Sequence, residues 1–458
     1  MMHRISMISL GCPKNQVDAE RMLAKLDAAG FEIGDIYEGV EAVIINTCGF
    51  IDAAKEEAIE NILDMAQLKK EGLVGKIIVT GCLAQRHKEE VLSEIPEIDA
   101  VVGIGANESI ADIVGSLLGE AAEDMPENEA GEGNGAYCAF PDVNGLPLTG
   151  ERLLTTPEYW SYLKIADGCS NRCSYCTIPY IRGNYRSVPM ETLIEEAKAL
   201  AQSGTKELIL IAQDTTNYGM DLYGELKLPE LLNSLCEIEG IEWIRMLYCY
   251  PDKITDELLD VMAKQQKVLN YIDLPLQHAD NGILKAMNRR GTREEYTALI
   301  AKIRETLPDC VIRTTFITGF PGEGEEEFEN LAEFVNEIEF DRLGCFAFSP
   351  QEGTPAFDME GAVDEQVKAD RGEIIMNDQL EIVTLKNSER VGRIYRVLVE
   401  DYDPYTDSYS GRTYMDAPEI DGKIDFTTGA EYKPGDFAEV EVIGVNDYDL
   451  IGRDVKYL

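Results

Sequence analysis

Residues 168–176, GCSNRCSYC, directly follow the strand-like stretch YLKIAD and hold Cys169, Cys173 and Cys176 in a C-x3-C-x2-C spacing. A structural zinc site normally closes its tetrahedron with four protein ligands. Iron–sulfur clusters are also held by short-spaced cysteine runs. Three thiolates from one loop can hold three corners of a cubane cluster, which leaves the fourth iron open to a substrate or cofactor. The loop therefore predicts a catalytic cluster rather than an electron carrier.

A second set of cysteines stands in the amino-terminal part of the chain. Residues 1–118 alternate short apolar strands with helical stretches at about 18–29, about 53–70 and from about 88, which predicts a doubly wound parallel α/β sheet. Cys12 follows ISMISLG, Cys48 follows VIINT and Cys82 follows IIVTG. Ligands bind at the carboxyl ends of such strands, so three thiols are expected to meet there. They predict a second cluster with an open iron; three separate buried cysteines are the alternative.

The rest of the chain divides into three regions. Residues 119–154 are predicted to be an acidic, mobile linker, because residues 120–150 contain seven acids, five glycines and no Lys or Arg. Residues 155–387 resume the βα rhythm with six strand candidates, which predicts a partial (β/α)6 barrel with the cysteine loop after its first strand. Residues 388–458 are β-branched and turn-punctuated, which predicts a small five-stranded barrel, OB-like or of the TRAM type.

The composition of the chain limits the kinds of macromolecule that it is expected to bind. The chain has 458 residues, 41 Lys+Arg against 85 Asp+Glu and a net charge of −44. Nucleic-acid binding depends on neutralised phosphates, so direct binding of nucleic acid is not expected and a basic protein partner fits better. Eleven cysteines are a poor disulfide framework. No long apolar run and no signal-peptide pattern are found, so the expected location is the cytoplasm.

These motifs resemble the radical SAM superfamily, and over the full length its methylthiotransferase branch. The resemblance implies two 4Fe-4S clusters, one on Cys12, Cys48 and Cys82 and one on Cys169, Cys173 and Cys176, with S-adenosylmethionine as cofactor. It implies that one S-adenosylmethionine donates a methyl group to sulfur and a second yields a radical. An electron donor and a sulfur source are implied as well. The carboxyl-terminal region corresponds to the family's TRAM domain.

Two further groups of residues are candidates near the cysteine loop. By resemblance, Tyr175 would meet the adenine and Gln213 would contact the cofactor; a packed loop aromatic is the alternative for Tyr175. Asp214 could equally cap a turn. Arg182 and Arg186 suggest a carboxylate partner in so acidic a chain, with a surface ion pair as the alternative.

The charge of the carboxyl-terminal region and several short motifs predict the class of substrate. Residues 388–458 carry 16 acids and 8 bases, so this TRAM-like region would repel a phosphate backbone and attract a basic ribosomal protein. SLGCPKNQVDAE, NTCGFIDAAKEEAIE, AQDTTNYG and MDAPEIDG are similar to the RimO family. That family acts on an aspartate of ribosomal protein S-twelve, on its β-carbon. A tRNA adenosine methylthiotransferase is the nearer alternative, and a non-enzymatic iron–sulfur module the remoter one.

Overall fold

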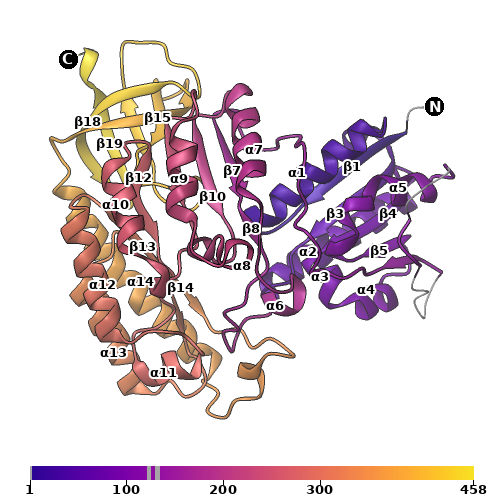
Figure 1. The fold of residues 1–458 in the computed structure, drawn as a ribbon, viewed down its shortest axis with the longest axis horizontal. Helices are drawn as coiled ribbons and strands as arrows, with labels where there is room; N and C mark the ends of the chain where they lie inside the picture. Colours follow the sequence, from indigo (N-terminus) through magenta and orange to yellow (C-terminus); the bar gives the residue numbers. More distant parts are fainter. Residues whose placement is uncertain (1–2, 121–124, 129–134, 458) are drawn as a thin grey trace.

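The computed structural model describes residues 3–120, 125–128 and 135–457, which form an amino-terminal α/β sheet, a central barrel and a small carboxyl-terminal barrel (Figure 1). The predicted architecture is confirmed in all three parts. The central barrel lies between the other two parts, so it is the element that both of them contact (Figure 1). None of the helices described by the structure combines the length and the apolar character that crossing a membrane would need.

The amino-terminal sheet is parallel, with the strand order β2-β1-β3-β4-β5-β6. Its core strand β3 is buried on both faces. Val43 and Ile45 pack into one core and Ala42 and Ile44 into the other, as expected for a sheet covered by helices on both sides. The elements are β1 (Arg4–Ser9), α1 (Pro13–Ala28), β2 (Glu32–Ile33), β3 (Val40–Thr47), α2 (Asp52–Lys70), β4 (Val74–Gly81), α3 (Cys82–Arg86), α4 (Lys88–Glu94), β5 (Ala100–Val102), α5 (Ile110–Leu117) and β6 (Tyr137–Ala139).

Two details differ from the sequence expectation. Helix α1 begins at Pro13 and not near residue 18, because a proline at the first helical position has no amide that needs a partner and its φ already suits a helix. Strand β6 lies inside the segment expected to be a linker, and it pairs with β5 at the edge of the first sheet. The linker residues 121–124 and 129–134 lie outside the described residues.

The central sheet has the order β14-β13-β12-β11-β10-β7, all parallel, and β14 and β7 do not pair, so the barrel is partial. All six predicted strands are present. The strands are β7 (Trp160–Lys164), β10 (Glu207–Ile211), β11 (Trp243–Met246), β12 (Val268–Asp273), β13 (Val311–Thr318) and β14 (Arg342–Ala347), with a small pair β8 (Ala166–Asp167) and β9 (Arg186–Ser187). The helices are α6 (Ile178–Ile181), α7 (Met190–Gln202), α8 (Met220–Tyr223), α9 (Leu228–Cys236), α10 (Asp256–Lys264), α11 (Asn281–Ala286), α12 (Arg293–Thr306), α13 (Glu325–Ile338) and α14 (Glu365–Ser388).

The carboxyl-terminal domain is a closed barrel with the order β15-β16-β17-β19-β18. It covers the end of the central barrel at which the strands begin. Arg412 forms an ion pair with Glu207 at the start of β10 (2.7 Å), and Arg342 at the start of β14 pairs with Asp416 (2.5 Å). The opposite end of the central barrel, where parallel strands end, therefore stays available for a site. The strands are β15 (Ile394–Asp403), β16 (Ser408–Arg412), β17 (Ile424–Thr427), β18 (Phe437–Asn446) and β19 (Asp449–Asp454).

Substitution of Glu207 tests the contribution of the contact between the central barrel and the carboxyl-terminal barrel to stability. Glu207 is fully enclosed between Arg245 (2.7 Å) and Arg412, so Glu207→Gln leaves two buried cations short of a partner. The loss should destabilise the fold by about 3–5 kcal/mol, measured as a lower denaturant midpoint. Glu242→Gln is the matched control, because its pair with Arg396 lies at the surface of the same junction. Equal effects of the two substitutions would contradict this account.

Candidate functional site

The three amino-terminal cysteines lie at the carboxyl ends of neighbouring strands, as predicted. Cys12 is the residue before α1, Cys48 follows β3 and Cys82 begins α3 directly after β4. Glycines let the loops touch. A Cβ on Gly11, whose φ is +89°, would lie 2.8 Å from the Cys48 sulfur, and one on Gly49 would lie 2.8 Å from the backbone of Leu83. The chain therefore brings these three loops into mutual contact.

The three thiols have different electrostatic surroundings. Burial raises the pKa of Cys82 to about 12, and burial also raises the pKa of Cys48. For Cys12 burial acts in the same direction, but the charges of Lys14 and Arg182 outweigh it and lower the pKa of that thiol. Metal ligation requires thiolates. The nearby cations are therefore of the kind that would stabilise a negatively charged cluster.

The second cysteine set lies on the loop after β8. Its backbone is held by hydrogen bonds from the Cys169 amide to the Gly183 carbonyl (3.1 Å) and from the Ser174 amide to the Met287 carbonyl (2.9 Å). The Cys173 sulfur lies 3.7 Å from the Tyr250 hydroxyl and 3.9 Å from an Arg289 nitrogen. Burial raises the pKa of Cys169 to about 11. A rigid loop beside a buried arginine thus presents these thiols.

The donor set suits a cluster better than a single ion. Among the residues that the structure describes, no group of three or more His, Cys, Asp or Glu side chains is arranged to hold one metal ion. In a cubane cluster each thiolate binds a different iron, so its ligands stand farther apart than those of one ion. Two sets of three cysteines, with no fourth protein ligand implied, fit two such clusters.

Tyr175 is part of the cysteine loop, and Gln213 lies beside the strand that precedes the loop. The Tyr175 ring packs edge-on against Phe320 with centroids 6.5 Å apart, so its packing role is real whatever else it contacts. The Gln213 amide donates to Asp167 (3.3 Å), while its carbonyl oxygen is buried and has no hydrogen-bond partner among the described residues. That oxygen is free for a ligand. Asp214 accepts instead from Lys253 (2.5 Å) and Asn171 (2.7 Å), which ties β10 to the cysteine loop.

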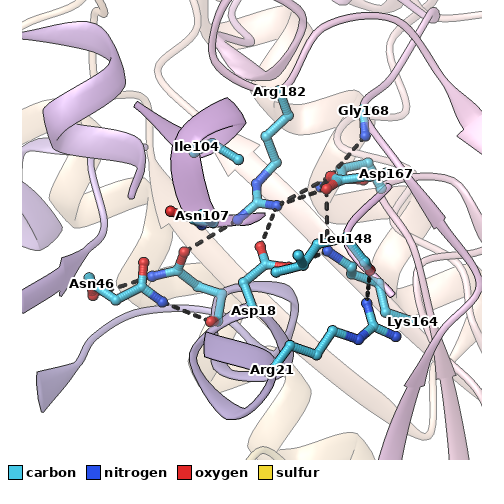
Figure 2. A network of polar contacts seen from close by, with 12 residues as sticks. Asp18, Arg21, Asn46, Ile104, Asn107, Leu148, Lys164, Asp167, Gly168 and Arg182 are labelled. Atoms are coloured by element: carbon cyan, nitrogen blue, oxygen red, sulfur yellow. Dashed lines mark hydrogen bonds and ion pairs between the residues drawn. The ribbon is translucent and has the colours of Figure 1, made fainter. Parts of the chain in front are cut away.

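A buried network of charges joins the two cysteine regions (Figure 2). Arg182, only 1% exposed, lies between Asp18 of α1 (2.9 Å) and Asp167 of β8 (3.1 Å). Lys164 bonds to the same two carboxylates, at 3.2 Å from Asp167. The carboxylate partner suggested for Arg182 therefore exists, but it is internal, and the surface ion pair is excluded. One domain contributes Asp18 and the other contributes both cations.

The network continues to the amino-terminal cysteine loops. Arg182 donates to the Asn15 side chain (3.2 Å), which itself donates to the Leu10 carbonyl (2.8 Å). Asn46 donates to the Asn15 carbonyl (2.8 Å). Since Leu10 and Asn46 lie two residues before Cys12 and Cys48, a single arginine connects the positions of both thiols to the cysteine loop of the barrel.

A second group of ion pairs supports this interface at its side. Glu20 is enclosed by Arg152 (2.6 Å) and Thr155, and Glu196 of α7 accepts from both Arg152 and Arg21. Sequence reasoning identified Arg182 but missed Asp18, Lys164 and Asp167. A charged residue inside the apolar strand YLKIAD is the signal that could have found Lys164, because an unpaired charge is rarely buried.

Comparison with known proteins places this geometry in a class. Family models match residues 4–103 (Uncharacterized protein family UPF0004), 163–335 (Radical SAM superfamily) and 391–455 (TRAM domain). Among solved structures, the radical S-adenosylmethionine methyltransferase TsrM from Kitasatospora setae superposes with a TM-score of 0.60 at 14% identity, covering 78% of this chain and 77% of that one. The fold and the cysteine loop define a radical SAM enzyme.

Full-length relatives narrow the class to one family. A protein of Acetivibrio thermocellus named ribosomal protein uS12 methylthiotransferase RimO is 47% identical over 100% of this chain and 99% of its own length. A RimO protein of Lachnoclostridium phytofermentans is 48% identical over 98% of this chain and 99% of its own length. A RimO protein of Clostridioides difficile is 45% identical over 100% of this chain and 99% of its own length. The chain belongs to the RimO family of radical SAM methylthiotransferases.

Arg182→Met tests the interdomain network. It leaves Asp18 and Asp167 buried with only Lys164 as a cation, which should cost about 3–5 kcal/mol of stability. Faster proteolysis within residues 119–154 and a lower thermal midpoint are the expected results. Arg4→Met removes an arginine of the amino-terminal domain that pairs with the exposed Glu32 and Glu38, and it should leave both the proteolysis rate and the thermal midpoint nearly unchanged. A protein with Arg182→Met that is as resistant as the wild type would contradict the role of this network.

Asp167 gives the network a pH dependence. Burial alone would raise the pKa of this carboxyl, but Lys164 and Arg182 outweigh it and hold the pKa far below its usual range. Its stabilising contribution is therefore complete above the unfolded pKa of about 3.9 and is lost as the pH falls below that value. Asp167→Asn should be less stable than the wild type at pH 7, and the difference should shrink below about pH 4. Thermal midpoints measured from pH 7 to 3 check this; a constant difference would contradict it.

Proposed function

We propose that this chain attaches a methylthio group to the β-carbon of an aspartate in ribosomal protein uS12. Full-length similarity to proteins named for that activity supports the proposal. The observation that carries it is the pairing of two three-cysteine sets across one buried arginine. A single cysteine loop would account for radical formation, whereas transfer of sulfur needs a second place that holds it. The tRNA-modifying alternative is not favoured by these relatives.

We assign the two cofactor-binding roles to named side chains. Cys12, Cys48 and Cys82 would hold one 4Fe-4S cluster, and Cys169, Cys173 and Cys176 the other. With S-adenosylmethionine bound, these clusters supply the radical and the methylated sulfur. The free carbonyl oxygen of Gln213 would orient the cofactor, and Tyr175 would bound its pocket. Arg182 and Asp167 would keep the two loops in register and exclude water from between them.

The charge of the chain favours a basic protein as the macromolecular partner. The TRAM domain carries twice as many acids as bases, 16 against 8. Complementary charge raises the rate of encounter and disfavours partners of like charge, such as a phosphate backbone. We therefore propose that the acidic TRAM domain attracts uS12 to the chain, in the cytoplasm, with an electron donor and a sulfur source supplied by other molecules.

Anaerobic reconstitution with a uS12 peptide tests the function. The wild-type chain should bind about eight iron atoms and should add the mass of one methylthio group, in place of one hydrogen, to the peptide. Replacing Cys12, Cys48 and Cys82 together by Ala should halve the iron and abolish the modification, while S-adenosylmethionine is still cleaved after reduction. Modification should be lost without loss of S-adenosylmethionine cleavage because the two cysteine sets lie on different domains.

Cys236→Ala is the matched control, since this cysteine lies in α9 away from both sets. It should load and react like the wild type. A chain that loads both clusters yet modifies only tRNA would overturn the substrate, and one that binds iron without cleaving S-adenosylmethionine would overturn the enzyme class.

A further inference from the structure

Lys14 is a buried lysine that has no carboxylate at ion-pair distance among the described residues. It is the second residue of α1, its residue is 6% exposed, and its ammonium lies 3.1 Å from the centroid of the Tyr248 ring. Within the described parts of the chain, no carboxylate lies at ion-pair distance from this nitrogen, and no hydrogen bond from it is formed. The ring face of Tyr248 attracts a cation, but it does not neutralise the charge.

Other buried lysines of the chain have carboxylate partners. In the part of the chain that the structure describes, Lys164 is paired with Asp18 and Asp167, and Lys368 with Glu365. An enclosed charge without a counter-ion costs free energy. Lys14 also stands in the first turn of a helix, where the macrodipole disfavours a cation. The Cys12 thiolate and Asp273 attract Lys14 through space, but neither forms an ion pair or hydrogen bond with it among the described residues. Its N–H donors therefore remain available to an anionic ligand.

The position of Lys14 places that anion between the two cysteine sets. Cys12 is two residues before Lys14, at the amino-terminal cap of the same helix. Tyr248 follows β11 at the end of the barrel where strands terminate, and its amide donates to Asp273 at the end of β12 (2.8 Å). Asp273 forms its ion pair with Arg313 (3.0 Å) and attracts Lys14 only through space. The open cation thus faces the mouth of the barrel beside Cys12.

We propose that the Lys14 ammonium, enclosed against Tyr248 beside Cys12, binds the side-chain carboxylate of the aspartate that is modified. This inference rests on the proposed function and names the group that selects an acidic target. The carbon that receives the sulfur is bonded directly to the carboxyl carbon of an aspartate side chain. A cation next to the sulfur-holding set therefore fixes the acceptor carbon at that sulfur. It also rejects a neutral amide of the same shape.

Binding of two peptides to the reconstituted full chain, without reductant so that no turnover occurs, tests the proposal. One peptide carries the target aspartate and the other has asparagine in its place. Fluorescence anisotropy should show the wild type binding the aspartate peptide about tenfold or more tightly than the asparagine peptide, as expected for a desolvated charge pair. Lys14→Met should bind both peptides equally, and Lys14→Arg should restore part of the preference.

Turnover gives a second readout. In reductant, Lys14→Met should raise the KM for the peptide by a similar factor, with little change in the KM for S-adenosylmethionine. Lys25→Met on the same helix, whose lysine pairs with Glu108 at the surface, should behave like the wild type. Iron content and circular dichroism check that each variant is folded and loaded; Lys14→Gln replaces Lys14→Met if the latter does not load.

The possible failures are distinguishable. A loaded wild type that leaves the peptide unmodified overturns the proposed function, and this inference with it. A wild type that modifies the peptide, while Lys14→Met keeps the full preference for aspartate over asparagine, overturns the inference alone. A loss of S-adenosylmethionine affinity in Lys14→Met, with the peptide preference kept, would assign the site to the cofactor's carboxylate and would also overturn it.

Discussion

Arg182 stands between Asp18 and Asp167 with almost no access to solvent, and the arrangement of both cysteine regions depends on it. Replacing such a buried charge group by apolar residues can be neutral for stability, whereas removing one member is costly. The main effect of this buried charge group is therefore to fix one relative arrangement of the two domains. A hydrophobic contact would allow the amino-terminal sheet to slide on the barrel, but these charge-assisted hydrogen bonds have one arrangement in which all are satisfied.

Arg182 also affects the ionisation of one of the predicted cluster ligands. Arg182 and Lys14 lower the pKa of Cys12 against the effect of burial, so the cations that hold the interface together also favour a thiolate there. At the opposite end of the barrel, the TRAM domain covers the beginnings of the strands through Glu207 and Asp416. The acidic domain is thus fixed to the barrel without obstructing the end at which the cysteine loop lies.

Much of the fold could be predicted because its signals are local. The six barrel strands, the five-stranded terminal barrel and the strand-end positions of Cys12, Cys48 and Cys82 follow from short apolar runs and the residues after them. The start of α1 was wrong, since Pro13 is permitted at a helix start. Strand β6 was missed because Tyr137–Ala139 is short and lies in an acidic, glycine-rich context, and only pairing with β5 makes it a strand.

The sequence by itself determined which residue types are present at which strand ends, and from them the two three-cysteine sets, because parallel strands carry their ends to one edge. Only the tertiary structure decided how the two edges meet. The partners of Arg182 are 164 residues away at Asp18 and 15 residues away at Asp167, and no local pattern relates them. Likewise, the absence of a carboxylate at ion-pair distance from Lys14, within the described residues, is a property of the packed interface, because an exposed lysine in the same motif would need no partner.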